Sequence, residues 1–349
     1  MPLSMENPLL ASDIMEAREL KDGKIFLLRG RDGSTLVLKA ETGVTGDKIK
    51  ATAPVMKAID PSVKMKPLTQ SEVMQLKQFL RSWKMYVEFL KFVTGSDTDL
   101  PISADEKKSM DELETCVNQY GAGGGSGRSD IAKMSYQKMS TLSSVLKVEG
   151  KPANDASWDE ARSTFAEFVK ALNASGGLEK LGQIVAGDFF IGNQDRFVSS
   201  GRGVQVQLYG EKHRLNVILN LGNVIVVKDA KGKARPSMLD YMDPNTEFLD
   251  PTLTLATMRN ADDWPMRVLL DKKQRFAFAE KLVEDLEYIL KPEKSLFGFN
   301  KLGGSRAPSR VNDGIVKGIK AIIKTLGPRQ AKLAPLMQSY FAEVKGAKL

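Results

Sequence analysis

The chain has 349 residues, 42% of them hydrophobic and 27% charged, so it can bury a sizeable core, and its length suggests two domains or one two-lobed domain. Its single cysteine, Cys116, excludes an intramolecular disulfide and a cysteine-based zinc site, and fits a reducing compartment. Its single histidine, His213, excludes a histidine-rich metal centre and most histidine-dependent catalytic triads. Any chemistry must therefore come from carboxylates, amides and lysines.

The charge balance bears on partners and location. With 51 basic and 43 acidic residues the net charge is +8, which favours acidic partners such as nucleotide phosphates, anionic lipid or an acidic protein. No basic patch interleaved with aromatic residues accompanies this charge, so no nucleic-acid partner is expected. No apolar run approaches the roughly 18 to 20 residues of a transmembrane helix, and the N-terminal segment lacks the pattern of a cleaved signal peptide. We therefore expect a cytoplasmic protein.

The N-terminal region has an α+β pattern. Residues 24–41 predict a β-hairpin, because two β-rich runs flank an Asp-Gly turn. Lys39 interrupts the second run, and it either lies on the solvated face of an edge strand or places its ammonium against an anion. Helical spacing then predicts a helix over residues 46–60, and residues 63–68 alternate like a strand. A hairpin, a helix and a strand in this order indicate an α+β fold.

Two helices and a glycine-rich segment follow. Residues 72–93 predict a long helix whose aromatic and methionine residues are typical of core, and residues 105–120 predict a more polar one. The glycine-rich residues 121–128 lack the Gly-Lys-Ser/Thr ending and the preceding strand of a phosphate-binding loop, so we interpret them as a flexible linker or insertion. Residues 130–146 have a weakly helical pattern, and residues 155–175 predict a further helix.

The C-terminal part of the chain reads as mainly helical. Residues 246–290 predict helices that end before Pro292. Residues 314–344 form a basic amphipathic region, with isoleucines on one face and lysines on the other. Such a helix either packs on the second lobe or offers a surface to a partner or a membrane.

The stretch 178–198 predicts an apolar helix that ends in the polar turn 192–196, which by itself is consistent with an ordinary Asx turn. Two short apolar strands follow, one entered at Asn223 and the other ending at Asp240. Mg²⁺ prefers oxygen ligands, often one or two carboxylates together with phosphates, which this Asn and Asp can provide. Asp195, in the turn, can accept a proton from an attacking hydroxyl.

The segments GDFFIGNQDRF, GNVIVV and MLDYMDP resemble the catalytic core of the atypical kinases with an Asn-x-Asp-Arg loop, most closely the actin-fragmin kinase type. Type II phosphatidylinositol 4-kinases and HipA-type kinases are similar more distantly. The resemblance implies an α+β, two-lobed protein kinase-like fold, with a small β-rich N-lobe at residues 1–70 and a larger, mainly helical C-lobe at residues 71–349. It also implies ATP and Mg²⁺ as cofactors.

The resemblance assigns a role to each matching residue of the later segments. Asp195 is the catalytic base, and Arg196 lies near the phosphates or orients the loop. Asn193, at the start of the same loop, is assigned to the nucleotide site. Asn223 and Asp240 are assigned to the metal.

Other residues are alternatives for some of these roles. Asn216 and Asn220 are alternatives to Asn223, because the spacer between the loop and the strand is long. Asp188 is interpreted as a structural acid rather than the base.

The resemblance makes Lys39 the lysine that contacts ATP, and this interpretation then outweighs the solvated edge strand. The acidic partner of this lysine stays open. Asp47 is the acid of the following helix, Glu41 lies beside the lysine, and Glu72 lies beyond the next strand.

We therefore predict an ATP- and Mg²⁺-dependent kinase that transfers phosphate to a hydroxyl, with a protein Ser or Thr as the expected acceptor. The alternatives are a phosphoinositide kinase and a catalytically inactive, kinase-like binding or scaffold protein. A pair of kinase lobes without regulatory repeats is compatible with a bacterial effector and virulence protein, delivered into a host cell without a cleaved signal peptide.

Overall fold

The chain folds into two compact units in the computed structural model. The first comprises Met1–Lys50 and Lys64–Gln137, and the second comprises Ala51–Val63 and Lys138–Leu349. The division expected at residue 70 falls inside the first unit. The structure describes residues 1–40, 45–61, 65–96, 98, 100–122, 129–135, 166–193, 204–207, 214–217, 224–228, 232–238, 266–289, 302, 304–333 and 335–349.

A five-stranded antiparallel sheet, in the order β1-β2-β3-β5-β4, forms the centre of the first unit. The expected hairpin is confirmed: β2 pairs with β3, and between them Gly33 adopts a left-handed φ of 81° while Asp32 Oδ1 accepts a hydrogen bond from the Ser34 N–H. The expected helix after the hairpin and the expected short strand are present as α1 and β4. The bounds are β1 Ile14–Lys21, β2 Ile25–Gly30, β3 Thr35–Ala40, α1 Thr45–Ile59, β4 Met65–Pro67 and β5 Ile131–Ser135.

Strand β5 corrects one prediction from the sequence. Its five residues were expected to continue a weakly helical segment, but they form a strand that pairs with β3 on one side and β4 on the other. The side chains of Ile131, Ala132 and Met134 are buried there. Hydrogen bonds to two neighbouring strands and this burial outweigh a weak local preference for helix. Residues 136–146 lie outside the described part of the chain.

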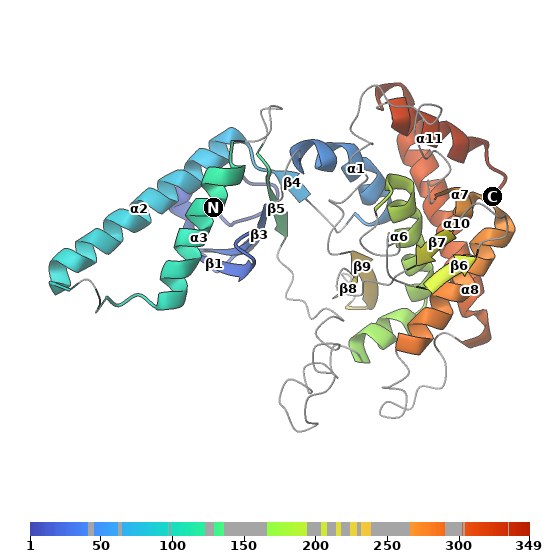
Figure 1. The fold of residues 1–349 in the computed structure, drawn as a ribbon, viewed down its shortest axis with the longest axis horizontal. Coiled ribbons are helices and arrows are strands. Elements are labelled where there is room, and N and C mark those ends of the chain that lie inside the picture. Colours follow the sequence, from blue (N-terminus) through green and yellow to red (C-terminus); the bar gives the residue numbers. More distant parts are fainter. Residues whose placement is uncertain are drawn as a thin grey trace. The chain divides into compact units, whose positions relative to one another are not determined.

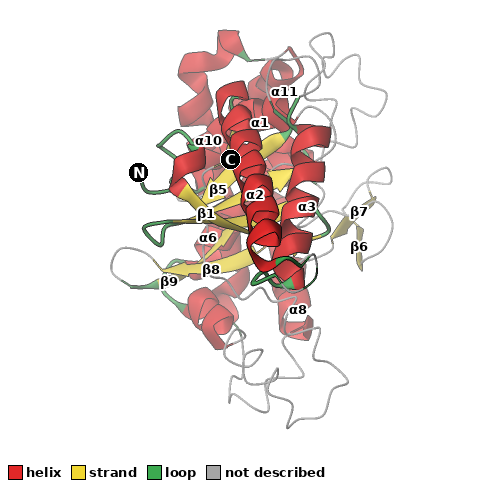
Figure 2. Cartoon of the chain, turned by 90° about the vertical axis from the view of Figure 1, so that its left-hand side faces the viewer, coloured by secondary structure: helices red, strands yellow, loops and turns green. Residues whose placement is uncertain are grey.

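Two helices, α2 (Gln70–Thr94) and α3 (Ala104–Tyr120), cover one face of this sheet, and Figure 2 shows them in front of the strands. Both helices were predicted. Helix α2 begins with a capping box between Thr69 and Glu72, and Ser103 caps α3 by accepting the Glu106 N–H. The core between helices and sheet is apolar, and includes Phe26, Leu28, Leu36, Leu38, Leu76, Leu80, Leu113 and Val117.

The second unit is mainly helical. Its helices α6, α8 and α10 lie side by side (Figure 1). Two short hairpins accompany them, β6 with β7 and β8 with β9. The bounds are α6 Gly177–Ile191, β6 Val204–Gln207, β7 Arg214–Val217, β8 Val224–Lys228, β9 Ala234–Met238, α7 Met266–Leu270, α8 Lys272–Ile289, α10 Ala307–Leu326 and α11 Pro335–Gly346. The protein is thus α+β, with an antiparallel sheet near the N-terminus and a mainly helical remainder.

Helices α6 and α10 are in backbone contact because glycines lie between them. A Cβ at Gly182 would overlap the Val311 carbonyl oxygen, and a Cβ at Gly314 would overlap the Glu179 carbonyl oxygen. The predicted isoleucine face of α10 packs inward, with three of its four isoleucines fully buried, while its lysines at 317, 320 and 324 are exposed. This helix therefore packs within the second unit, as one of the two interpretations expected. No helix in the described ranges has the length and apolar character needed to cross a membrane.

Candidate functional site

The predicted catalytic turn begins where α6 ends. Gly192 closes the helix with a left-handed φ of 67°, a conformation that favours glycine. Asn193 follows, and its side-chain Nδ2 donates to Asp188 Oδ1 at 3.0 Å while its backbone N–H donates to the Asp188 carbonyl at 2.8 Å. Both side chains are buried. The chain therefore leaves α6 along a fixed path, and Asp188 has the structural role expected of it.

Four of the predicted site residues, Asp195, Arg196, Asn223 and Asp240, lie outside the described residues, so their roles stay predictions. Strand β8, which follows Asn223, and strand β9, which precedes Asp240, are described. Hairpin β8–β9 begins one residue after Asn223 and ends two residues before Asp240. Val224, at the start of β8, pairs with Met238, at the end of β9. The chain therefore enters and leaves the hairpin at the same end.

Lys39 lies on β3, the middle strand of the five, which contradicts the interpretation of a solvated edge strand. It pairs with Ile25 on β2 and with Ala132 on β5, and its side chain is half-buried. Alternate residues of β3, Leu36 and Leu38 among them, point into the core under α2 and α3. Because strand side chains alternate between faces, Lys39 lies on the opposite face of the sheet.

Three acids were considered as partners of Lys39, and the side chains of two of them lie outside the described part of the chain. The backbone of Asp47 lies in α1, but its side chain is outside what the structure describes, as is Glu41. The side chain of Glu72 is described, and it forms an ion pair with a different lysine. It binds Lys133 on β5, and Lys133 pairs with Leu38, on the face opposite Lys39. Glu72 is therefore excluded as a direct partner of Lys39.

The Glu72–Lys133 pair is a closed, buried ion pair in the first unit. Lys133 Nζ donates to Glu72 Oε1 at 2.7 Å and to the Asn7 carbonyl at 2.8 Å. The Glu72 carboxylate also accepts the backbone N–H groups of Leu9, at 3.1 Å, and Thr69, at 2.9 Å. Burial disfavours the charged carboxylate, but these hydrogen bonds outweigh burial and lower the pKa of Glu72. The pair joins α2 to the sheet and the N-terminal segment.

A second buried charge group, which sequence reasoning missed, lies in the second unit around Asp60, the residue after α1. Ser237 Oγ donates to Asp60 Oδ2 at 2.6 Å, and Lys180 Nζ lies 3.6 Å from the same oxygen. Arg235 Nη2 lies 3.5 Å from Asp60 Oδ1. Lys180 also donates to the Ile59 carbonyl. We call these residues, Asp60, Lys180, Arg235 and Ser237, the Asp60 cluster.

The Asp60 cluster connects the end of α1 to α6 and β9. Burial lowers the pKa of Lys180, the Asp60 charge opposes this, and the Arg235 charge lowers it further. The Nε atom of Arg235 is buried without a hydrogen-bond partner. A lysine within the apolar pattern of α6 was the signal that could have revealed a buried ion pair. Because α6 and β9 lead into the predicted catalytic and metal-binding segments, the cluster holds the two elements from which those segments start.

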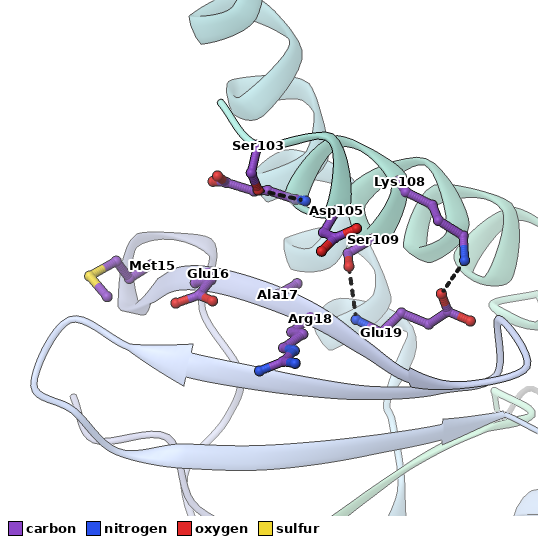
Figure 3. Close-up of a pocket in the computed structure, with 10 residues that line it drawn as sticks. Met15, Glu16, Ala17, Arg18, Glu19, Ser103, Asp105, Lys108 and Ser109 are labelled. Atoms are coloured by element: carbon purple, nitrogen blue, oxygen red, sulfur yellow. Dashed lines mark hydrogen bonds and ion pairs between the residues drawn. The ribbon is translucent and has the colours of Figure 1, made fainter. Parts of the chain in front are cut away.

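A pocket of about 640 Å³ lies in the first unit between β1 and the start of α3 (Figure 3). None of the predicted site residues line it. Its wall contains the Glu19–Lys108 ion pair at 3.3 Å, and Ser109 Oγ accepts the Glu19 N–H at 3.1 Å. A hydrogen bond from Gly23 and the contact with Lys108 lower the pKa of Glu19. Glu19, Lys108 and Ser109 are thus engaged in contacts within the first unit.

The described residues contain no group of three or more His, Cys, Asp or Glu side chains placed to hold a metal ion. Cys116 is buried, and burial raises the pKa of its thiol to about 12, so it is not a nucleophile at neutral pH. Comparisons with protein families, with curated proteins and with solved structures found no match to this chain.

Proposed function

We propose that this protein is an ATP- and Mg²⁺-dependent kinase that transfers phosphate to a hydroxyl group, with a protein Ser or Thr as acceptor. The proposal starts from the resemblance of GDFFIGNQDRF, GNVIVV and MLDYMDP to the atypical kinase core. The finer fold that it implies is a small β-rich lobe and a larger, mainly helical lobe. The described elements support the proposal at three places.

The observation that carries the proposal is the register of β8 and β9. Val224 is paired with Met238, so the connections toward Asn223 and Asp240 leave the same end of the hairpin. Consecutive Cα atoms are about 3.8 Å apart, so short connections restrict how far these two residues can lie from that end. An amide and a carboxylate that start from one hairpin end fit the oxygen ligands of a Mg²⁺–nucleotide complex.

The first unit supplies the second support. The hairpin β2–β3 and the strand β4 belong to this unit, and α1, whose residues from Ala51 onward belong to the second unit, lies between them in the chain. This is the order expected for the small lobe of a kinase. Lys39 occupies the third strand, which is the strand that carries the ATP lysine in protein kinases. Its side chain is half-buried on the face of the sheet opposite α2 and α3, and the proposal assigns it to the nucleotide phosphates.

The third support is the fixed start of the loop. Asn193 is bound to Asp188 through both its side chain and its backbone, so the loop that contains Asp195 starts from a rigid helix end. In the proposed reaction Asp195 orients the acceptor hydroxyl and takes its proton, and Lys39 binds the phosphates. Bound Mg²⁺, held by Asn223 and Asp240, would neutralise phosphate charge. Positioning and charge neutralisation together supply the rate.

The test measures phosphate transfer from labelled ATP, with Mg²⁺, to the protein itself, to a model protein substrate and to phosphoinositide vesicles. Asp195→Ala and Asp240→Ala should each lower transfer about 100-fold or more. Asp313→Asn, an exposed acid on α10, is the matched control and should transfer phosphate at the parent rate. If both alanine variants transfer as much as the parent, the assignment of these residues is wrong.

The acceptor decides between the proposed function and its rivals. Labelling of vesicles but not of protein would identify a phosphoinositide kinase. No transfer, together with a rise in melting temperature on adding ATP and Mg²⁺, would identify a nucleotide-binding protein without kinase activity. No transfer and no such rise would favour a scaffold that does not bind nucleotide.

A further inference from the structure

The outer half of α2 carries a stripe of exposed apolar side chains. We call Met85, Tyr86, Phe89, Phe92 and Val93 the α2 stripe. Their exposed fractions are 74%, 49%, 59%, 86% and 61%, respectively. At 100° per residue, these positions fall on one side of the helix.

The α2 stripe is separate from the face by which α2 joins the core. The buried residues of α2 end at Leu80, and Trp83 is the last residue of the helix that packs against the core cluster. The sequence predicted that the aromatic and methionine residues of this helix belong to the core, but Met85, Phe89 and Phe92 are among its most exposed side chains. Single exposed apolar side chains are ordinary, whereas five neighbouring ones, three of them aromatic, indicate an interaction surface.

The stripe is presented by a well-anchored helix. Lys84 Nζ lies 2.7 Å from Glu114 Oε1, which ties the outer half of α2 to α3. Tyr86 packs against Trp83 with ring centroids 6.2 Å apart. Gly95, at a φ of 64°, closes the helix through its N–H to the Lys91 carbonyl. A preformed surface loses little conformational entropy on binding.

The charges beside the stripe distinguish between partners. Lys84 is paired with Glu114, and Lys91 Nζ is paired with Glu88 Oε1 at 2.8 Å. Counting Arg81, three cations face two carboxylates along this border, which leaves a net charge of only +1. An anionic membrane would favour a basic border with free lysines. A two-fold interface places one surface against itself, so it requires a border that does not repel its own copy.

We propose that the α2 stripe binds the same stripe of a second copy of this chain. The exposed fractions correspond to on the order of 500 Å² of side-chain surface per chain, since an aromatic residue can bury roughly 150–250 Å². Two copies would then bury on the order of 1,000 Å², which is at the low end for specific interfaces. The dimer is therefore weak and reversible, with a dissociation constant in the micromolar range. This inference is independent of the proposed kinase activity.

The test is sedimentation equilibrium of the full chain at concentrations from about 1 to 100 µM, which bracket a micromolar dissociation constant. The parent should show a reversible monomer–dimer equilibrium. The double variant Phe89→Asp/Phe92→Asp should weaken association more than about 100-fold, because it buries two unpaired charges at the centre of the interface. Leu20→Asp, at a side chain 46% exposed on β1, is the matched control and should dimerise like the parent.

Folding of the variants can be checked separately. Both phenylalanines are more than half exposed, so the double variant should keep the far-ultraviolet circular dichroism and the melting temperature of the monomeric parent. A parent that stays monomeric up to 100 µM, or a double variant that dimerises like the parent, would overturn the proposal. Sedimentation of the monomeric parent with anionic vesicles, lost in the double variant, would identify a membrane surface as the partner instead.

Discussion

The two units each bury a charged group, but they do so in different ways. In the first unit one carboxylate, Glu72, meets one ammonium, Lys133, and backbone groups complete the hydrogen bonding of both. In the second unit one carboxylate, Asp60, faces two cations, Lys180 and Arg235. Within the described residues, the first group is neutral and the second has a positive charge in excess.

This difference in charge and hydrogen bonding indicates that the Glu72–Lys133 pair has a purely structural role. A neutral, hydrogen-bonded pair of this kind stabilises one arrangement of strands and helix. The Asp60 cluster keeps a buried Nε atom of Arg235 unbonded and a lysine whose pKa is lowered. It also holds the elements that lead to the predicted catalytic and metal residues. We therefore expect the second unit to respond more strongly to alkaline pH, and the first to acid.

The largest effect is expected from Glu72→Gln, which leaves the Lys133 ammonium buried without a counter-charge. The free energy of unfolding should fall by about 3–5 kcal/mol. The pH dependence should change as well. The pKa of Glu72 is lowered in the folded state, so its contribution is present above the ordinary glutamate pKa of about 4.3 and is lost as pH falls through the folded-state value. Urea unfolding between pH 3 and pH 7 should show a weaker acid destabilisation in the variant.

Glu114→Gln is the control for that change, because it breaks the more exposed ion pair with Lys84, which joins α2 to α3. It should lower the free energy of unfolding by less than about 1 kcal/mol. If Glu72→Gln and Glu114→Gln lower the free energy of unfolding equally, burial does not determine how much the Glu72–Lys133 pair contributes to stability.

Asp60→Asn should have the next largest effect, because Lys180 and Arg235 then lack their carboxylate while the amide oxygen still accepts from Ser237. We expect a loss of about 3 kcal/mol at pH 7, the lower end of the range for a broken buried pair. Since the pKa of Lys180 is lowered in the folded state, the unfolded chain binds more protons just below about pH 10.4, and stability rises with pH there. Removing the Asp60 charge lowers that pKa further, so the rise should be steeper in the variant.

Urea unfolding of Asp60→Asn and the parent at pH 8, 9 and 10 measures the slope of the unfolding free energy against pH. Ser237→Ala serves as the matched comparison, because it removes one hydrogen bond to the same carboxylate and no charge. If the free energy of unfolding changes with pH in the same way in all three proteins, the pKa of Lys180 does not depend on Asp60 as we infer.

The smallest loss of stability is expected from a substitution in the second unit at the contact between α6 and α10, which depends on glycine and not on charge. Gly314→Ala places a Cβ against the Glu179 carbonyl, so α10 must shift away from α6, at a cost of about 1–3 kcal/mol. Gly327→Ala, where the nearest atom to a Cβ is 4.0 Å away, is the control and should be neutral or slightly stabilising. Thermal unfolding of both variants gives the comparison, and equal melting temperatures would argue against close α6–α10 packing.

Part of the fold could be predicted because its signals are local. The Asp-Gly turn gave the β2–β3 hairpin, and helical spacing gave α2, α3, α6 and α10. β5 could not be predicted, because its partners on β3 lie far from it in sequence and its own five residues carry little preference. The Gly192 turn was predicted, but the Asn193–Asp188 bond that fixes it was not.

By itself the sequence determined the order of hairpin, helix and strand and the apolar helix ending at Gly192. Only the tertiary structure decided which charges meet. Lys133 forms an ion pair with Glu72, which is 61 positions away in the sequence, and Ser237 donates a hydrogen bond to Asp60, which is 177 positions away. It also placed Lys39 on a central strand and left the α2 stripe exposed. The reason is physical: turn and helix preferences act between near neighbours in the chain, whereas burial and ion pairing depend on which distant segments pack together.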